Sequence, residues 1–351
     1  MSFRLHPSRC AVVSALAATF LTGGAQAASW CPAPSVPEAV AAVLARDIDK
    51  RAGDPPRAVA HLHTEGTLPH QGIWDASVEA KKDLPLVREL ALSWRLHRDP
   101  AVLERLSRLL DAWASAYQPD FNPIDETDFD GLVDAFAIAR SDLPQATRDK
   151  VSAFLRAWAG GYLDQMQRLA SPAKTTWINN WQSHRVKLLT LIAAALDDDA
   201  LFDGARQQFR KQVGQNLQAD GASIDVAERD ALHYQVYDLE PLVRAALAAR
   251  IRGEDWLAFR AGNGASLAAG LDWLRPYASG EKQHQEYVHT TVKFDLARRA
   301  AGVPGFSGPW EPAGSASLYW LASALDARFA PVASALGPQP AWMAACWGSR
   351  P

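Results

Sequence analysis

The segment Trp177–Arg185 combines side chains that could bind a sugar with side chains that could move a proton. It opens a stretch with the apolar periodicity of a helix, and Asn179 could cap that helix. Asn180 and His184 are four residues apart, so they would share one helix face. Aromatic rings stack on sugars and amides bind hydroxyl groups, which favours a carbohydrate site. The alternative interpretation is a helix cap followed by a half-buried core histidine. Three further candidates for substrate contact in this segment are Asn179, Trp181 and Gln182.

A second segment, Arg229–Leu242, offers a tyrosine that could take or give a proton. If the segment is helical, Arg229, His233 and Tyr237 share a face at steps of four residues, and Tyr234 lies on the adjacent line. We expect His233 and Tyr237 to contact the substrate. A phenol becomes a useful base only when neighbouring positive charge lowers its pKa, and Arg229 or a nearby imidazole could supply that charge. The alternative is a surface ladder of ion pairs with one tyrosine in the core.

Other polar and aromatic segments could complete a cleft. Residues 284–295 contain His284 as a candidate substrate contact, and the spacing of Tyr287 and Thr291 is helical. The two histidines and the glutamate of this segment do not form H-E-x-x-H, so we expect no metal site. The loop Leu68–Trp74 contributes Gln71 and Trp74 as further substrate contacts.

The elements that must position these side chains are helices. Apolar residues recur at steps of three and four over most of the chain, and β-branched runs are scarce. Asp99-Pro100 divides the first long stretch, residues 85–117, into two antiparallel helices, and Pro241 either interrupts a helix or begins one. The connectors are short, so we expect helical hairpins in a single all-α domain, packed as a solenoid or closed into a toroid.

The N-terminus has the pattern of a secretory signal. Two arginines precede a short apolar run, and Ala25-Gln26-Ala27 fits a cleavage site, so we predict a signal peptide at residues 1–27 and one domain at 28–351. We therefore expect a periplasmic or secreted protein without membrane insertion. Cys31 and Cys346 then remain of the three cysteines, and an oxidising compartment favours a disulfide between them over two free thiols.

Net charge excludes one class of partner. The chain of 351 residues has a formal net charge of −3, which argues against nonspecific binding of nucleic acid. A polyanionic substrate would need a locally positive cleft on an acidic body. We expect the protein to act as a monomer.

The chain resembles the alginate lyase superfamily of polysaccharide lyases over roughly residues 64–309. The resemblance rests on four motifs and the Val-Pro-Gly tail at 303–305; the motifs are 117–126, 179–185, 220–242 with its Tyr-x-x-Tyr-x-Leu-x-Pro-Leu core, and 284–298. It implies an incomplete α/α toroid and metal-free β-elimination without a cofactor. It also implies that Tyr234 is the catalytic tyrosine, that Arg229 accompanies it, and that Asn180 and His184 act as the family's Asn/His pair. In the periplasmic alginate lyases, however, a histidine directly follows the asparagine, whereas this chain has Trp181 there.

The implied substrate is an anionic polysaccharide, alginate or a related polyuronate. Tyr234 would act as base and acid, and Asn180 and Arg229 would neutralise the uronate carboxylate electrostatically. His184 would be the base for the epimer whose proton lies on the opposite face. Two alternatives stay open: a glycoside hydrolase on a similar toroid, using paired carboxylates, or a non-catalytic periplasmic polysaccharide-binding protein. The acids available for hydrolysis are Asp125, Glu126, Asp238 and Glu286.

Overall fold

The computed structural model describes Met1 and residues 30–32, 35–171 and 173–349. Apart from Met1, the predicted signal peptide at 1–27 lies outside this part, as do the first two residues of the predicted domain. The described residues fold into helices with short connectors, and their only β-structure is two isolated bridges. None of these helices is long and apolar enough to cross a membrane.

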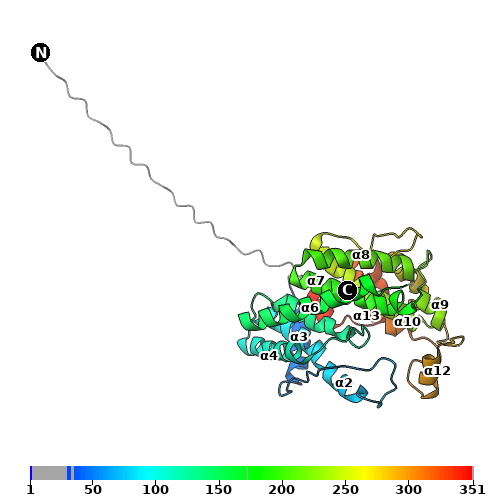
Figure 1. The fold of residues 1–351 in the computed structure, drawn as a ribbon, viewed down its shortest axis with the longest axis horizontal. Coiled ribbons are helices and arrows are strands. Elements are labelled where there is room, and N and C mark those ends of the chain that lie inside the picture. Colours follow the sequence, from blue (N-terminus) through cyan, green and yellow to red (C-terminus); the bar gives the residue numbers. More distant parts are fainter. Residues whose placement is uncertain (2–29, 33–34, 172, 350–351) are drawn as a thin grey trace.

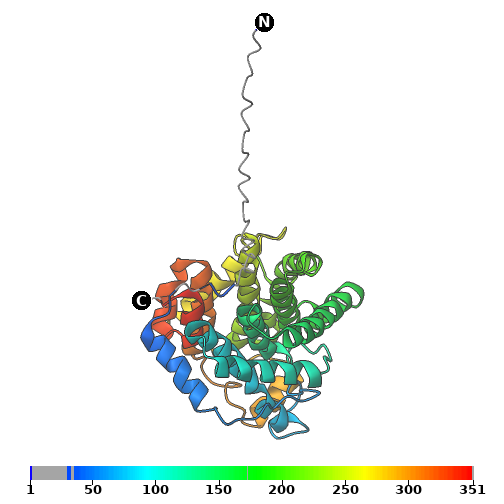
Figure 2. The same ribbon diagram turned by 90° about the vertical axis from the view of Figure 1, so that its left-hand side faces the viewer.

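An inner set of five helices forms the wall around which the molecule curves (Figures 1 and 2). Each packs against the next in the order in which they are listed. The five are α3 (Asp83–His97), α5 (Asp130–Ala139), α7 (Asn180–Leu196), α10 (Leu232–Ala249) and α13 (Ala316–Leu325). Helix α7 is buried on almost every side, as expected of a helix that is covered all round.

The outer layer alternates with the inner one along the chain, which produces the hairpins predicted from sequence. Helices α4 (Pro100–Ala116), α6 (Gln145–Arg168) and α8 (Asp199–Asn216) each pack against an inner partner, and α11 (Leu267–Ala278) packs against α10. The break predicted at Asp99-Pro100 is confirmed, because the Asp99 side chain accepts a hydrogen bond from Ala101 N at 2.9 Å and caps α4.

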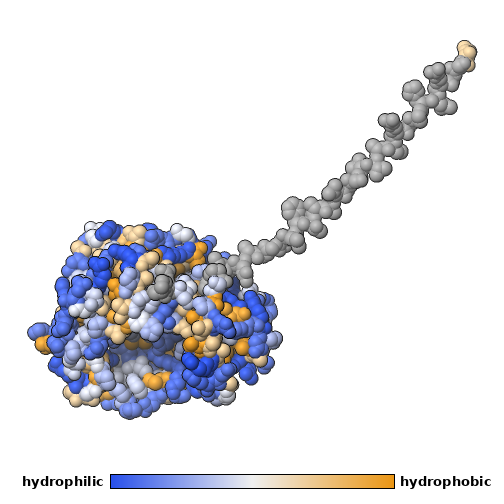
Figure 3. Space-filling model, turned by 180° about the vertical axis from the view of Figure 1, so that it is seen from behind, coloured by the Kyte–Doolittle hydropathy of each residue, from blue (hydrophilic) through white to orange (hydrophobic). Residues whose placement is uncertain are grey.

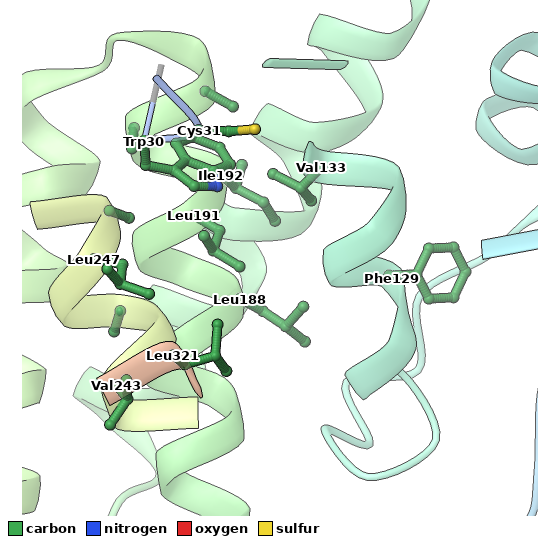
Figure 4. Packing of buried hydrophobic residues seen from close by; sticks show 14 of the residues in the cluster. Trp30, Cys31, Phe129, Val133, Leu188, Leu191, Ile192, Val243, Leu247 and Leu321 are labelled. Atoms are coloured by element: carbon green, nitrogen blue, oxygen red, sulfur yellow. The ribbon is translucent and has the colours of Figure 1, made fainter. Parts of the chain in front are cut away.

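The two ends of the chain meet where the ring of inner helices is incomplete. Helix α15 (Ala341–Trp347) packs against both α3 and α13, and α1 (Glu38–Asp49) packs against α15 and α3. Cys31 and Cys346 form a disulfide with Cα atoms 4.3 Å apart, which confirms the predicted pairing. Figure 4 shows Trp30 and Cys31 beside Ile192 of α7, so the N-terminal segment is part of the core.

The remaining helices are short. Helices α9 (Ile224–Arg229) and α14 (Ala330–Leu336) have six and seven residues. Helices α2 (Trp74–Lys81) and α12 (Lys293–Ala300) lie at the lower edge in Figure 1. Five 3₁₀ turns complete the elements: η1 (Thr127–Phe129), η2 (Thr175–Trp177), η3 (Arg250–Arg252), η4 (Pro312–Ser315) and η5 (Ala327–Phe329).

Two sequence expectations about helices are wrong. Pro241 neither interrupts nor begins a helix, because α10 runs through it as one element. Residues 287–292 are not helical: Tyr287 has a φ of +60° and α12 begins only at Lys293. The helical spacing of Tyr287 and Thr291 is therefore coincidental.

Candidate active site

A cleft of about 410 Å³ gathers residues from four distant parts of the chain. Its walls come from the loop at 64–69 with α2, from the start of α7, from α9 and α10, and from α12 with the residues that follow it. In Figure 3 the molecule is visibly hollowed on the face opposite to that of Figure 1. The predicted site residues that line the cleft are Asn180, Arg229, Tyr234, Trp74, Trp181, His233 and Tyr237.

The phenol of Tyr234 lies between two guanidinium groups. Arg229 Nη1 donates a hydrogen bond to Tyr234 Oη, and its guanidinium carbon lies 4.1 Å from the centre of the Tyr234 ring. Arg298 Nη1 lies 3.4 Å from the same oxygen. Asp295 accepts from Arg229 Nη1 at 2.6 Å, which fixes the guanidinium beside the phenol. Two positive charges directed at one oxygen stabilise its deprotonated form.

Burial nevertheless changes the pKa of Tyr234 more than those two charges do. Desolvation raises the pKa of Tyr234 above its ordinary value, while Arg229 and Arg298 partly oppose the increase. The expectation that neighbouring charge lowers this pKa overall is therefore wrong, because the phenol is 7% exposed and loses more from desolvation than it gains from the arginines. In the free protein Tyr234 is protonated at neutral pH.

A strained turn brings Arg229 and Tyr234 together. The expected continuous helix is broken at Asp230, which adopts a left-handed conformation with φ +53° between α9 and α10. Tyr287 N donates to Asp230 O at 2.7 Å, and His284 Nε2 lies 3.1 Å from the same carbonyl. His284 therefore contacts the turn. It does not line the cleft, so its prediction as a substrate contact is not supported by its position.

Asn180 is held rigidly at the first position of α7. Its backbone N donates to Asp225 Oδ2 at 2.9 Å, and its Nδ2 donates to Asp225 Oδ1. Asn216 Nδ2 donates to the same carboxylate at 3.2 Å. Burial raises the pKa of Asp225 to about 6, although these donors oppose the rise. The Asn180 amide has a second N–H hydrogen, and the residue lines the cleft although it is 2% exposed.

His184 lies in a neighbouring cavity of about 300 Å³, which we call the inner cavity. His233 and Tyr237 line both the cleft and the inner cavity, whereas Tyr234 lines only the cleft. The Tyr237 ring lies 4.3 Å from the His184 imidazole and covers it, so the expectation that His184 faces the cleft of Tyr234 is wrong. Burial and Lys187 lower the pKa of His184 well below its usual range. The imidazole is therefore neutral and does not supply the positive charge expected beside Tyr234.

Three predicted substrate contacts are structural instead. Asn179 caps α7 by accepting from Trp181 N at 3.1 Å. Gln182 is 3% exposed and donates to Met166 Sδ and Gln208 in the core. Gln71 accepts from Leu68 N within its own exposed loop.

His233 contributes a neutral imidazole to the cleft. Its ring is accessible from the cleft, but the surrounding protein and the charges of Arg298 and Arg229 lower its pKa to about 4. The ring lies 5.3 Å from the Tyr234 ring and stacks on Tyr237 at 5.9 Å.

Sequence reasoning missed Arg298, Lys81 and Glu65, which also line the cleft. Arg298 packs over Phe294 and Phe306 at 4.1 and 4.8 Å, and no described carboxylate pairs with it. An available signal was the pair Phe294 and Arg298 at one helical turn, an aromatic ring under a cation. Lys81 pairs with Asp128 at 3.2 Å, and burial raises the pKa of Glu65.

Among the described residues, no group of three or more His, Cys, Asp or Glu side chains could hold a metal ion.

The cleft and the helical fold have counterparts among known proteins. An alginate lyase from Bacteroides ovatus superposes with a TM-score of 0.62 at 16% identity, covering 88% of this chain and 92% of that one. Alginate lyase A1-III from Sphingomonas species A1 gives a TM-score of 0.62 at 17% identity, covering 92% and 93%. These similarities establish the α/α-toroid fold.

Sequence comparison places the chain more narrowly. A polysaccharide lyase from Stenotrophomonas maltophilia (strain K279a) is 44% identical over 68 residues, which span 19% of this chain and 20% of that protein. The family model for alginate lyase matches residues 25–284. Since that match spans most of the chain and the fold agrees with it, the protein belongs to the alginate lyase family of polysaccharide lyases.

Proposed function

We propose that this protein cleaves a uronate polymer by β-elimination, with Tyr234 as both base and acid. One observation carries the proposal: the Tyr234 phenol lies in a cleft between Arg229 and Arg298, and both guanidinium groups are directed at its oxygen. A saccharide-binding protein would not need a phenol in this arrangement. The proposal therefore favours an enzyme over the non-catalytic alternative.

Elimination first requires neutralisation of the uronate carboxylate. The proton on C5 is weakly acidic because the adjacent carboxylate is already negative, so donors directed at that carboxylate stabilise the developing enolate. Arg298 supports this role best, because it has no described carboxylate partner whereas Arg229 is paired with Asp295. Asn180 contributes its second amide hydrogen. Positive charge from arginine makes a metal unnecessary for this step.

The proton transfers then follow from the position of one phenol. Ionised Tyr234 takes the C5 proton, the C–H electron pair forms the C4–C5 double bond, and the bond between C4 and O4 breaks. The protonated Tyr234 returns that proton to O4 of the leaving sugar, which regenerates the phenolate. One group serves both steps only when the C5 proton and O4 lie on the same face. We therefore propose uronates of that configuration as substrates, such as mannuronate and glucuronate, since His184 lies in the inner cavity.

The hydrolase alternative lacks its acids in the cleft. Asp125, Glu126 and Asp238 are fully buried and each accepts hydrogen bonds from its own surroundings, and Glu286 accepts from Leu232 N at 2.9 Å. Glu65 is the only carboxyl residue among the described residues that line the cleft. Hydrolysis by two carboxyl groups needs a facing pair.

A solved neighbour supports a saccharide ligand for the cleft. Alginate lyase A1-III has been crystallised with a tetrasaccharide in variants where a histidine is replaced by alanine or a tyrosine by phenylalanine. We also propose that this protein is exported, periplasmic or secreted, which the disulfide between Cys31 and Cys346 supports.

The proposal is tested by incubating the purified protein with a panel of uronate polymers. Elimination creates a double bond conjugated to the carboxylate, so we expect ultraviolet absorbance to rise with at least one polymer, with and without EDTA. Release of reducing ends without that absorbance would indicate hydrolysis. Binding without either signal would support the non-catalytic alternative.

A further inference from the structure

The Asn180 side chain depends on a single contact for its orientation. Its backbone is fixed in several ways, because Asn179 caps α7 and Gln212 Nε2 of α8 donates to Asn179 O at 3.0 Å. Among the described residues, however, Asp225 is the only hydrogen-bond partner of Asn180 Nδ2. A carboxamide has nearly the same shape in its two flipped orientations. The partner of Nδ2 therefore decides which end of the amide carries the N–H hydrogens.

Asp225 is suited to this task because an ionised carboxylate can only accept hydrogen bonds. The residue is 0% exposed and accepts from Asn180 N at 2.9 Å, from Asn180 Nδ2 and from Asn216 Nδ2 at 3.2 Å. Burial raises its pKa to about 6, so the group is mainly ionised at neutral pH. A flipped Asn180 would place Oδ1 against the carboxylate, and two acceptors repel each other. The amide thus has one orientation, with Nδ2 toward Asp225.

A second buried carboxyl group lies nearby but has a different environment. Asp238 of α10 is also 0% exposed, and it accepts from Ser183 Oγ at 2.6 Å. Burial and the charge of Asp225 raise the pKa of Asp238 well above its ordinary value, which favours its protonated form. Of these two carboxyl groups, Asp225 is the one that carries the negative charge and contacts Asn180.

Helix α9 connects this contact to the phenol of Tyr234. Asp225 lies in the first turn of α9 and Arg229 is its last residue, four positions later, so the two side chains share one face. Arg229 donates to Tyr234 Oη, and Asp295 holds its guanidinium group. One short helix therefore fixes the Asn180 amide relative to Arg229 and the phenol.

We propose that Asp225 is a positioning residue for Asn180, which holds Nδ2 where its second hydrogen meets the uronate carboxylate. This role rests on the proposed function, in which Asn180 stabilises the developing enolate. Asp225 is fully buried and does not line the cleft, so it acts only through Asn180. A flipped amide would place Oδ1 where Nδ2 now lies, and a misplacement of about 1 Å can cost about 10²-fold in rate.

The kinetic test is a double-mutant cycle on the best polymer of the panel. Asp225→Asn brings an N–H group that can pair with Oδ1 of a flipped Asn180, so we expect kcat to fall at least about tenfold with a smaller change in KM. In an Asn180→Ala background, the same substitution should change kcat less than about twofold, because the group through which it acts is missing. Asp238→Asn is the matched control, since it replaces one neutral buried group by another of the same shape, and kcat should stay nearly unchanged.

A spectroscopic measurement does not depend on turnover. In isotopically labelled protein, the side-chain amide signal of Asn180 is identified by its loss from the nuclear magnetic resonance spectrum of Asn180→Ala. We expect this signal to move in Asp225→Asn and to stay in place in Asp238→Asn. If no polymer is cleaved by the unmodified protein but the signal moves in this way, the proposed function fails while the orientation of Asn180 by Asp225 stands.

Three results would overturn the assignment of Asp225. Equal losses of kcat in the two backgrounds would mean that Asp225 acts independently of Asn180. Unchanged kcat in Asp225→Asn would mean that the amide needs no carboxylate to orient it, as would an Asn180 signal that does not move. Circular dichroism checks folding, and Asp225→Ser, which removes the charge and leaves room for water, provides the same tests if Asp225→Asn does not fold.

Discussion

The cleft and the inner cavity share two lining residues, but they differ in whether every cation has a carboxylate partner. In and around the inner cavity, Arg88, Lys187 and Arg244 are paired with Asp130 and Asp134. In the cleft, Arg229 is paired with Asp295 and Lys81 with Asp128, but Arg298 has no described carboxylate partner. Paired charge stabilises the fold, whereas charge left without a counterion is available to a substrate.

The two histidines near the site, His233 and His184, also differ in their exposure. His233 lies open to the cleft, whereas His184 is covered by Tyr237 and fixed by Thr127. Both are neutral at physiological pH because their surroundings lower their pKa. A histidine in a polar segment is therefore not by itself a source of positive charge, and arginine has that role in the cleft.

Replacing Tyr234 by phenylalanine should produce the largest change in activity. Because only the hydroxyl is removed, we expect turnover to fall by about 10³-fold or more while the melting temperature changes little. Initial rates on the best polymer of the panel, with circular dichroism as the folding control, provide the measurement. Near-normal turnover would remove Tyr234 from the mechanism and make Tyr237 the candidate.

Asp134→Ala should break the paired network without touching the cleft. It removes one of the two carboxylates that pair with the buried guanidinium groups of Arg88 and Arg244 and leaves only Asp130 as their described carboxylate partner, so we expect the free energy of unfolding to fall by about 3 kcal/mol. Urea denaturation measures the loss. Asp164→Ala removes the half-exposed partner of Arg168 on the surface of α6 and should cost far less, because exposed ion pairs contribute little to stability. Equal losses in the two variants would contradict the structural role of the network.

Removing the disulfide by Cys346→Ser should lower stability but not the rate per folded molecule. The bond joins residues 315 positions apart, so it restricts the unfolded chain strongly, and we expect a loss of roughly 2–4 kcal/mol in the free energy of unfolding. Denaturation under oxidising conditions measures this loss. A large fall in turnover of the folded variant would link the chain ends to the cleft and weaken the contrast between structural and catalytic regions.

Arg298→Ala should show that the cation without a carboxylate partner contributes to activity more than to stability. Loss of one preorganised stabiliser of the enolate predicts a fall in kcat of about 10²-fold, with a smaller change in stability. Arg299→Ala is the matched control, since Arg299 donates to Tyr287 O at 3.0 Å and does not line the cleft. If the two variants lose the same activity, Arg298 has no direct role toward the carboxylate.

The pH profile should show the raised pKa of the base. Only ionised Tyr234 can accept the C5 proton, and burial raises its pKa above the ordinary value, so kcat/KM should rise with pH by roughly tenfold per unit through neutrality. Steady-state rates in overlapping buffers measure the profile. An optimum on the acidic side, with falling activity above it, would indicate a carboxyl group instead.

Much of the fold could be predicted because the spacing of apolar residues and the residues that end helices act over short stretches of sequence. Asp99-Pro100 both stops one helix and caps the next, a purely local effect. The break at Asp230 could not be predicted in this way. An aspartate in the left-handed region is held there by Tyr287 N, which lies 57 positions later, so the turn depends on tertiary contacts.

The sequence indicated which side chains line the cleft where a single segment forms its wall. Tyr234, Arg229 and Asn180 line it as expected, because each lies near the start or end of a helix that opens on it. The expectation for His184 is wrong, because spacing within α7 cannot show that Tyr237 of α10 covers the imidazole. Arg298 was missed because its importance comes from the absence of a counterion, which depends on which residue Asp295 binds.

The central claim is that bond cleavage is an elimination and not a hydrolysis. The direct test is to let the enzyme cleave its preferred polymer in water labelled with heavy oxygen and to analyse the products by mass spectrometry. Elimination by Tyr234 predicts unsaturated products without the label, since no water adds across the broken bond. Saturated products that carry one labelled oxygen for each bond cleaved, at the new reducing end, would contradict this account.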